Sequence, residues 1–131
     1  MRGLSIGQVG KKAELAASAI RYYERAGLLP KPMRVSGQRR YDPEILGRLE
    51  MIRIARISGF TVAETKTFLT GFPAGTKPSA RWQALAARKL VEIEAVIQTA
   101  RRMKASLETR FRCDCHEIAD CERAIAAKRC R

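Results

Sequence analysis

Apolar residues recur with a helical period from the start of the chain. Ser5 is suited to cap a first helix, in which Ile6 and Val9 share one face. A turn near residues 14–15 precedes a second amphipathic stretch over about residues 17–26. Two short helices joined by a tight turn predict a helix-turn-helix.

The second helix is followed by a stop signal and then by a hairpin pattern. Gly27 suits the left-handed position after a helix, and Pro30 prevents the helix from resuming. In residues 31–41, turn-forming residues lie between residues that favour strands, which predicts a β-hairpin wing. In such a layout one helix enters the major groove of DNA and the hairpin contacts the adjacent backbone.

Two further helices are expected before residue 70. Residues 42–44 form a helix start, and the helix runs to Gly59 with a core face made of Ile45, Leu49, Ile52 and Ile54. A capping box at residues 61–64 begins a fourth helix, which ends near Leu69. The Gly- and Pro-containing residues 71–78 then break the chain.

A long helix is expected over residues 79–111, which contain no Gly or Pro. A helix of that length extends for about 48 Å. Its apolar residues recur in two heptad series, interrupted at Lys104, and form an apolar seam: Ala86, Leu90, Ile93, Ile97, Ala100, Leu107 and Phe111. A small head cannot cover so long and narrow a seam, so pairing with a second copy, antiparallel or parallel, is the simplest solution. The alternative is a helix folded back on its own domain.

The positive net charge of this predicted helical protein indicates that it binds nucleic acid. The 131 residues include 26 Lys or Arg and 13 Asp or Glu, a formal net charge of +13. Residues 1–60 hold 12 basic and 5 acidic residues, a net charge of +7. Such a surface attracts phosphate through counterion release. The chain has one His, no nucleophile and base supported by a third group, and no Gly-rich phosphate loop, so we do not expect an enzyme.

All four cysteines fall in the last 19 residues, as Cys113, Cys115, Cys121 and Cys130. Thiols clustered after a long helix in a basic protein indicate a ligand site. His116 is a further candidate ligand, with plain solvent exposure as the alternative.

The expected location is the cytoplasm. No apolar run approaches the roughly 20 residues of a membrane span, and the N-terminal residues lack a secretory apolar region. In that compartment the cysteines stay reduced, so a disulfide framework is not expected. No membrane partner is expected either.

Several motifs together resemble the MerR family of bacterial transcription regulators over essentially the whole chain. They are Ile6-Gly7-Gln8-Val9, Ile20-Arg21-Tyr22-Tyr23-Glu24, Gly27-Leu28-Leu29-Pro30, Gln38-Arg39-Arg40-Tyr41 and Ile54-Ala55-Arg56-Ile57-Ser58-Gly59-Phe60. We expect a mainly α fold: a winged helix-turn-helix DNA-binding domain, a long antiparallel coiled-coil dimerisation helix and a short cysteine-bearing C-terminal tail. The expected divisions are 1–70 for the DNA-binding domain, 71–78 for the linker, 79–111 for the dimerisation helix and 112–131 for the sensing tail.

The resemblance implies a homodimer bound within an over-long spacer between two promoter elements. The effector-bound dimer bends and untwists that DNA, so that RNA polymerase engages both elements. The implied DNA contacts are Arg21, Tyr22, Tyr23, Lys31, Arg34, Arg39, Arg40 and Tyr41. For Tyr22, packing behind the helix is an equal alternative, and for Tyr41, packing under the wing is the preferred one.

A soft metal ion is the preferred effector. Cys113 and Cys121, with seven residues between them, resemble the pair that flanks a short loop in the copper, silver and gold sensors of the family. Thiolates favour soft ions such as copper(I), or zinc. The mercury, zinc and lead sensors add a cysteine at the start of the long helix, where this chain has Ser79, so Cys115 is the candidate third ligand.

A redox effector is the alternative. Cys113, Cys115 and Cys121 also resemble the last three cysteines of the SoxR-type iron–sulfur regulators. A [2Fe–2S] cluster needs four thiolates, and this chain has Arg110 at the position of the first one. Either Cys130 supplies the fourth thiolate, or the thiols are oxidised directly without a cluster. A metal-storage or metal-delivery protein is the hypothesis from another class, and it leaves the Arg-Tyr-Tyr helix and the wing unexplained.

Overall fold

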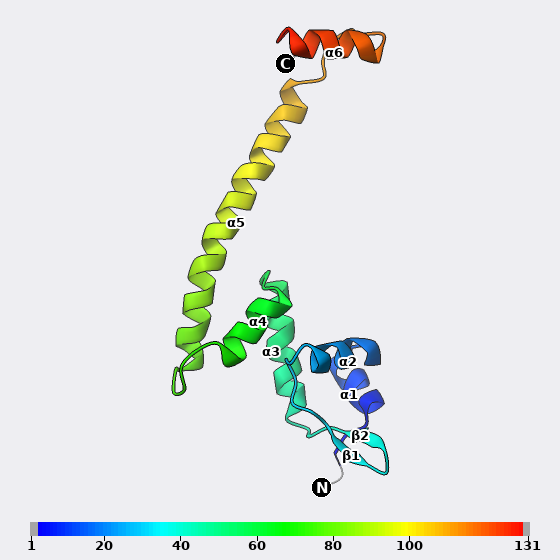
Figure 1. Ribbon diagram of the computed structural model, residues 1–131, viewed down its shortest axis with the longest axis vertical. Helices are drawn as coiled ribbons and strands as arrows, with labels where there is room; N and C mark the ends of the chain where they lie inside the picture. The colour runs from blue at the N-terminus through cyan, green and yellow to red at the C-terminus, as the bar shows by residue number, and fades with distance from the viewer. Residues whose placement is uncertain (1–2, 130–131) are drawn as a thin grey trace. The chain divides into compact units, whose positions relative to one another are not determined.

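The computed structural model describes residues 3–129, in two compact units, Met1–Lys89 and Leu90–Arg131. Each unit is described by itself. In chain order the elements are α1 (Ile6–Ala13), α2 (Ala17–Arg25), β1 (Met33–Val35), β2 (Gln38–Arg40), α3 (Ile45–Ile57), α4 (Val62–Thr70), α5 (Pro78–Thr109) and α6 (Ile118–Ala126) (Figure 1). The expected mainly α fold, with a wing and a long helix, is confirmed.

The helix-turn-helix forms as the sequence predicts. The Ser5 hydroxyl accepts the backbone N–H of Gln8, and the Gln8 side chain accepts the N–H of Ser5, which completes a capping box. Glu14 takes the left-handed conformation (φ 56°) and ends α1. Val9 and Ile20 are fully buried in one core cluster, so they fix α1 against α2.

A two-residue turn closes the wing. Its central residues, Ser36 (φ 52°) and Gly37 (φ 77°), both have positive φ, as a type I′ hairpin turn requires. The strands pair antiparallel, with Arg34 opposite Arg39. An isolated bridge between Leu4 and Tyr41 ties the N-terminal segment to the end of the hairpin.

The core face of α3 differs from the sequence prediction. Ile45, Leu49 and Ile52 are buried as expected, but the next buried residue is Ala55, and Ile54 is 46% exposed. Residues two positions apart on an α-helix point about 200° away from each other, so Ile54 cannot share a face with Ile52. The α-helix begins at Ile45, after a turn in which the Asp42 carboxylate accepts the N–H of Glu44 (2.9 Å).

The first turns of α5 belong to the core of the first unit. Trp82 stacks on Phe68 of α4, with ring centroids 3.9 Å apart, and Leu85 is buried in the same cluster with Phe60. The division between units therefore falls at Lys89, inside α5, whereas the sequence reading placed it at residues 71–78. This aromatic packing joins residues of different helices, so no local pattern in the sequence predicts it.

The second unit contains the rest of α5 and α6. Within it the apolar seam is open to solvent in the single chain, with Leu90 65% and Leu107 70% exposed. The seam is one residue shorter than expected, because α5 ends at Thr109 and Phe111 lies beyond it with φ 66°.

Gly10 is a test of the packing between α1 and α2. A Cβ at Gly10 would lie 2.6 Å from the carbonyl oxygen of Leu15, which is backbone and cannot move aside. We expect Gly10→Ala to lower the free energy of unfolding by about 1–3 kcal/mol, measured by chemical denaturation.

The matched control is Gly7→Ala on the same helix. There the nearest atom to an added Cβ, the Ser5 hydroxyl oxygen, is 3.9 Å away. Alanine should raise stability by up to about 1 kcal/mol through helix propensity. Equal effects of the two substitutions would contradict the close approach at Gly10.

Candidate nucleic-acid interface and cysteine segment

One side of α2 is open to solvent and carries polar and aromatic side chains. Ser18, Tyr22 and Arg25 are exposed and Arg21 is half-buried, at the i, i+3, i+4, i+7 spacing of a single helix face. We call these four residues the reading face. The opposite side is held by Ile20 in the core. A helix with one fixed and one open side has the form that major-groove recognition requires.

The two adjacent tyrosines have different environments. Tyr22 is 46% exposed on the reading face, whereas Tyr23 is half-buried and packs against the core cluster. Packing was an alternative that the sequence left open for Tyr22 and not for Tyr23. In the structure Tyr22 is the exposed one of the two. Arg25 and Ser18 were absent from the sequence-based set, although their spacing from Arg21 and Tyr22 is a signal that was available.

The hairpin divides its arginines between two faces. Arg34 and Arg39 lie opposite each other and so share one face, while Arg40 is paired with Met33 on the other. Arg34 donates to the carbonyl of Gly37 in the turn (3.0 Å). A groove of about 260 Å³ lies at the end of α2, lined by Glu24, Arg25, Lys31, Pro32 and Arg34. Lys31 and Arg34 therefore line the same groove as Arg25.

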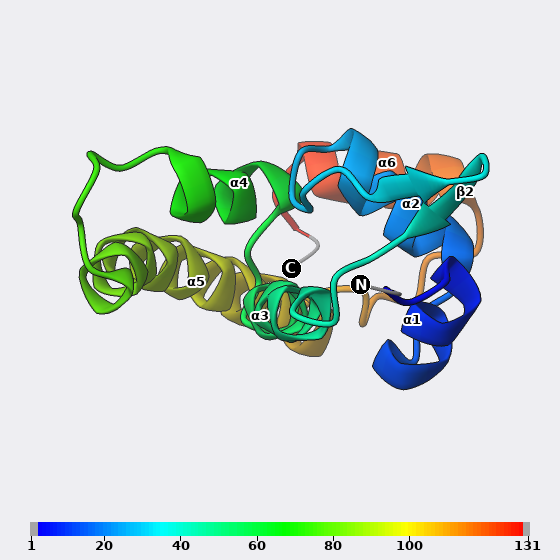
Figure 2. The same cartoon turned by 90° about the horizontal axis from the view of Figure 1, so that it is seen from below.

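Glu24 connects α2 to the hairpin through its contact with Arg39, and Figure 2 shows the two elements next to each other. Its Oε2 accepts the hydroxyl of Tyr41 (2.7 Å) and lies 3.6 Å from Nε of Arg39. Burial, together with this hydrogen bond and the nearby charge of Glu24, raises the pKa of Tyr41 to about 12. The Tyr41 hydroxyl therefore remains a donor at neutral pH.

This geometry corrects the assignment of Tyr41 as a DNA contact. Tyr41 is 1% exposed and its hydroxyl is directed to Glu24. A side chain that is almost completely buried cannot reach a phosphate or a base. Tyr41 supports the wing from beneath, which was the preferred interpretation of its position.

The C-terminal end of α2 is held by α3 and α4. Arg48 donates from Nη1 to the carbonyl of Leu28 (2.9 Å). Lys66 lies over Gly27, where an added Cβ would be 3.1 Å from Nζ. Cations at a helix C-terminus are favoured by the helix dipole. These contacts fix the segment directly after α2.

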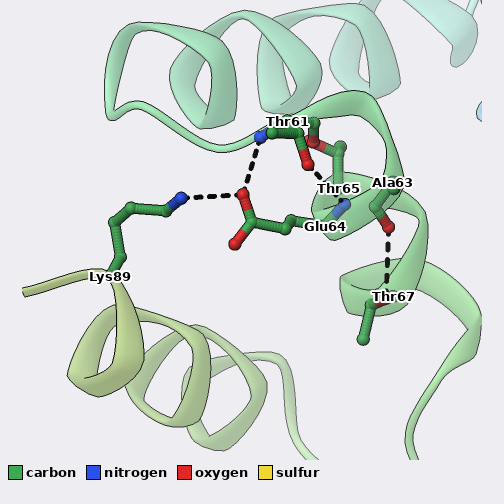
Figure 3. A network of polar contacts seen from close by, with 6 residues as sticks. All are labelled: Thr61, Ala63, Glu64, Thr65, Thr67 and Lys89. Atoms are coloured by element: carbon green, nitrogen blue, oxygen red, sulfur yellow. Dashed lines mark hydrogen bonds and ion pairs between the residues drawn. The ribbon is translucent and has the colours of Figure 1, made fainter. Parts of the chain in front are cut away.

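A polar network joins α5 to the start of α4 (Figure 3). Oε1 of Glu64 accepts the backbone N–H of Thr61 (2.9 Å) and pairs with Nζ of Lys89 (2.8 Å). Lys89 also lies 5.5 Å from the ring centroid of Phe60. The Lys89 hydrogen bond, followed by the Thr61 backbone N–H, holds the pKa of Glu64 below its ordinary value of 4.5.

The cysteine segment lies in the second unit. Cys113 is exposed and Cys115 half-buried in the stretch after α5, and Cys121 is half-buried on α6. His116 is exposed, and Cys130 lies outside the described residues. Within residues 3–129, no three His, Cys, Asp or Glu side chains are placed together so as to hold a metal ion. The described part of one chain thus supplies thiols, but not an assembled three-ligand site.

The fold and the reading face define a class, the winged helix-turn-helix DNA-binding regulators. The chain belongs to the MerR family: the family model described as MerR HTH family regulatory protein matches residues 4–71, and the model described as MerR, DNA binding matches residues 46–110. The relatives are transcriptional regulators and not enzymes. Among the described residues, no helix has both the length and the apolar character that crossing a membrane requires.

Individual relatives cover most of the chain. The HTH-type transcriptional regulator CueR of Yersinia pestis is 34% identical over 120 residues, covering 90% of this chain and 86% of the relative. The HTH-type transcriptional activator SoxR homolog of Chromobacterium violaceum is 26% identical over 120 residues, covering 91% and 81%. The structure of the transcription regulator PbrR691 from Ralstonia metallidurans, in complex with lead(II), has 30% identity and a TM-score of 0.74, covering 87% of this chain and 91% of that one.

The lowered pKa of Glu64 predicts an acid-dependent loss of stability. A carboxyl whose pKa is depressed by folding stabilises the protein fully above its ordinary value of 4.5, and the contribution disappears as pH falls through the lower folded value. We expect Glu64→Gln to lose about 1 kcal/mol at pH 7 and to flatten the acid limb of the stability curve. The measurement is denaturant unfolding between pH 7 and pH 3.

Glu50→Gln is the control for this experiment. Glu50 also pairs with a basic side chain, that of Arg53, but on the exposed surface of α3. Its removal should change stability little, because exposed ion pairs are screened by water. If Glu64→Gln loses stability at low pH as the wild-type protein does, the proposed role of the Glu64–Lys89 pair is contradicted.

Proposed function

We propose that this MerR-family transcriptional regulator binds promoter spacer DNA as a homodimer and distorts it in response to a soft metal ion bound by its C-terminal cysteines. The observation that carries the DNA-binding part is the reading face of α2 beside the arginine-bearing face of the hairpin. Groove contacts by a helix and backbone contacts by a wing are the two components of such recognition.

Arg21 is the residue we assign to the major groove, with Tyr22 and Arg25 beside it on the reading face. Arginine reads guanine through two hydrogen bonds, which is the commonest specific contact in protein–DNA complexes. Arg39 is assigned to the backbone, with Lys31, Arg34 and Arg40 contributing positive charge. RNA polymerase acts on the same promoter, and its engagement depends on the geometry of the DNA rather than on a contact with this protein.

A second copy of the chain is the proposed cover for the apolar seam. In the single chain Ile93 and Ile97 of the seam are exposed, along a helix whose heptad spacing suits a coiled coil. Small residues, Ala86 and Ala100, allow two helices to approach closely. An antiparallel pair would present two reading faces to one duplex.

The chemistry of the donors fits a soft ion. Cys113 and Cys121 are the proposed ligands, with Cys115 as the third and His116 and Cys130 as further candidates. A structural zinc site takes four ligands, so zinc would require Cys130 or donors of a second chain, whereas a copper-type ion accepts fewer thiolates. The lead(II) complex of PbrR691 supports an ion over a cluster.

A redox-sensing regulator is the second candidate. The similarity to the SoxR homolog favours it, and so does the spacing of Cys113, Cys115 and Cys121. Arg110 occupies the position at which a first cluster thiolate is expected, so a [2Fe–2S] cluster would need Cys130 as its fourth ligand.

The DNA assignment predicts different outcomes for two arginines. Arg21→Ala should reduce discrimination between a selected duplex and a random one by about 1–3 kcal/mol, which is the contribution of a bidentate base contact. Arg34→Ala should weaken binding to both duplexes and reduce the salt slope by about one unit. Fluorescence anisotropy over a range of salt concentrations measures both quantities. Equal, small losses from the two variants would count against the assignment.

The cysteine assignment predicts the contents of the purified protein. After anaerobic purification, elemental analysis should find copper or zinc without visible absorption bands, and Cys113→Ser should remove the metal while DNA affinity stays within about twofold. Ser106→Ala, on α5 shortly before the cysteine segment and without a thiol, is the control. Iron with sulfide and visible bands would instead support the redox candidate.

A further inference from the structure

The recognition helix carries an acidic residue that faces the wing. Glu24 belongs to α2, three residues after Arg21, and its side chain is 13% exposed. A negative charge in a phosphate-binding surface opposes binding by itself. Its presence between α2 and the hairpin therefore calls for a role other than contact with DNA.

Arg39 is the cation that this carboxylate compensates. Its Nε is buried and has no hydrogen-bond partner among the described residues. The Glu24 carboxylate, 3.6 Å away, is the anion that the structure places beside it. Removing one member of a partly buried pair leaves the other charge uncompensated, so the hairpin arginine would have to rearrange.

Tyr41 holds the carboxylate in position from the other side. Its buried hydroxyl donates to the same Oε2 atom that faces Arg39. Tyr41 is itself tied to Leu4 by two backbone hydrogen bonds, of 2.7 and 2.8 Å. The carboxylate is thus oriented by a rigid donor and directed toward a hairpin arginine.

We propose that Glu24 is a positioning and specificity-determining residue, which sets the spacing between the reading face and the wing by holding Arg39. Specific binding requires α2 and the hairpin to engage the groove and the backbone together, whereas non-specific binding needs only positive charge. A wing without this restraint would lower specific affinity while leaving attraction to phosphate unchanged or stronger. The inference rests on the proposed duplex recognition.

The test compares Glu24→Gln with the wild-type protein on two probes. One is a duplex enriched by the wild-type protein from a random-sequence pool, and the other is a random duplex of the same length. Because Gln keeps the shape and loses the charge, we expect the ratio of the two affinities to fall about tenfold, with random-duplex binding equal or tighter. Thermal unfolding confirms that the variant is folded.

Glu50→Gln is the matched charge control. It also removes a carboxylate that pairs with an arginine, but the pair lies on the exposed surface of α3. This variant should shift binding to both probes equally and keep the ratio. If Glu24→Gln behaves in the same way, Glu24 acts only through net charge and the proposal is overturned.

A double-mutant cycle with Arg39→Gln separates positioning from a general structural effect. If Glu24 acts through Arg39, Glu24→Gln should change the affinity ratio little in the Arg39→Gln background. Additive losses would refute the proposed route. A wild-type protein that does not distinguish the two probes would instead refute the proposed function, so the two failures can be told apart.

Discussion

A recognition helix can present one side to DNA only when its remaining sides are fixed, and α2 meets this requirement through three contacts. Ile20 is buried in the core, Glu24 pairs with Tyr41 and the wing, and Arg48 binds the carbonyl of Leu28. The first two contacts join α2 itself, and the third joins the segment directly after it, to other parts of the first unit. The orientation of the reading face is therefore a property of the whole unit and not of one helix.

The long helix is shared by both compact units. Its first turns pack through Trp82 and Leu85 into the core of the DNA-binding unit, and Lys89 pairs with Glu64 in the capping box of α4. The same helix continues through residues 90–109 toward the cysteine segment. Continuous backbone and a packed aromatic cluster thus provide a physical connection between the proposed sensing segment and the domain that reads DNA.

The high positive charge serves structure as well as DNA binding. Arg81 donates from Nη1 to the carbonyls of Phe68 and Leu69 and from Nε to that of Thr76. These carbonyls belong to the end of α4 and the segment after it, where arginine satisfies acceptors that a helix leaves without partners. Net charge alone therefore overstates the number of residues available to phosphate.

Local signals in the sequence determined the helix caps, the positive-φ turn of the wing and the family, because each depends on residues close together in the chain. Tertiary packing decided that Tyr41 is buried, whereas the exposure of Ile54 follows from the helical period, which a stricter count along the sequence already gives. Tertiary structure also decided which arginine of the hairpin meets α2, because the contact between Glu24 and Arg39 joins residues 15 positions apart. Such choices depend on which segments meet in space, and a linear pattern of apolar and charged residues does not encode that by itself.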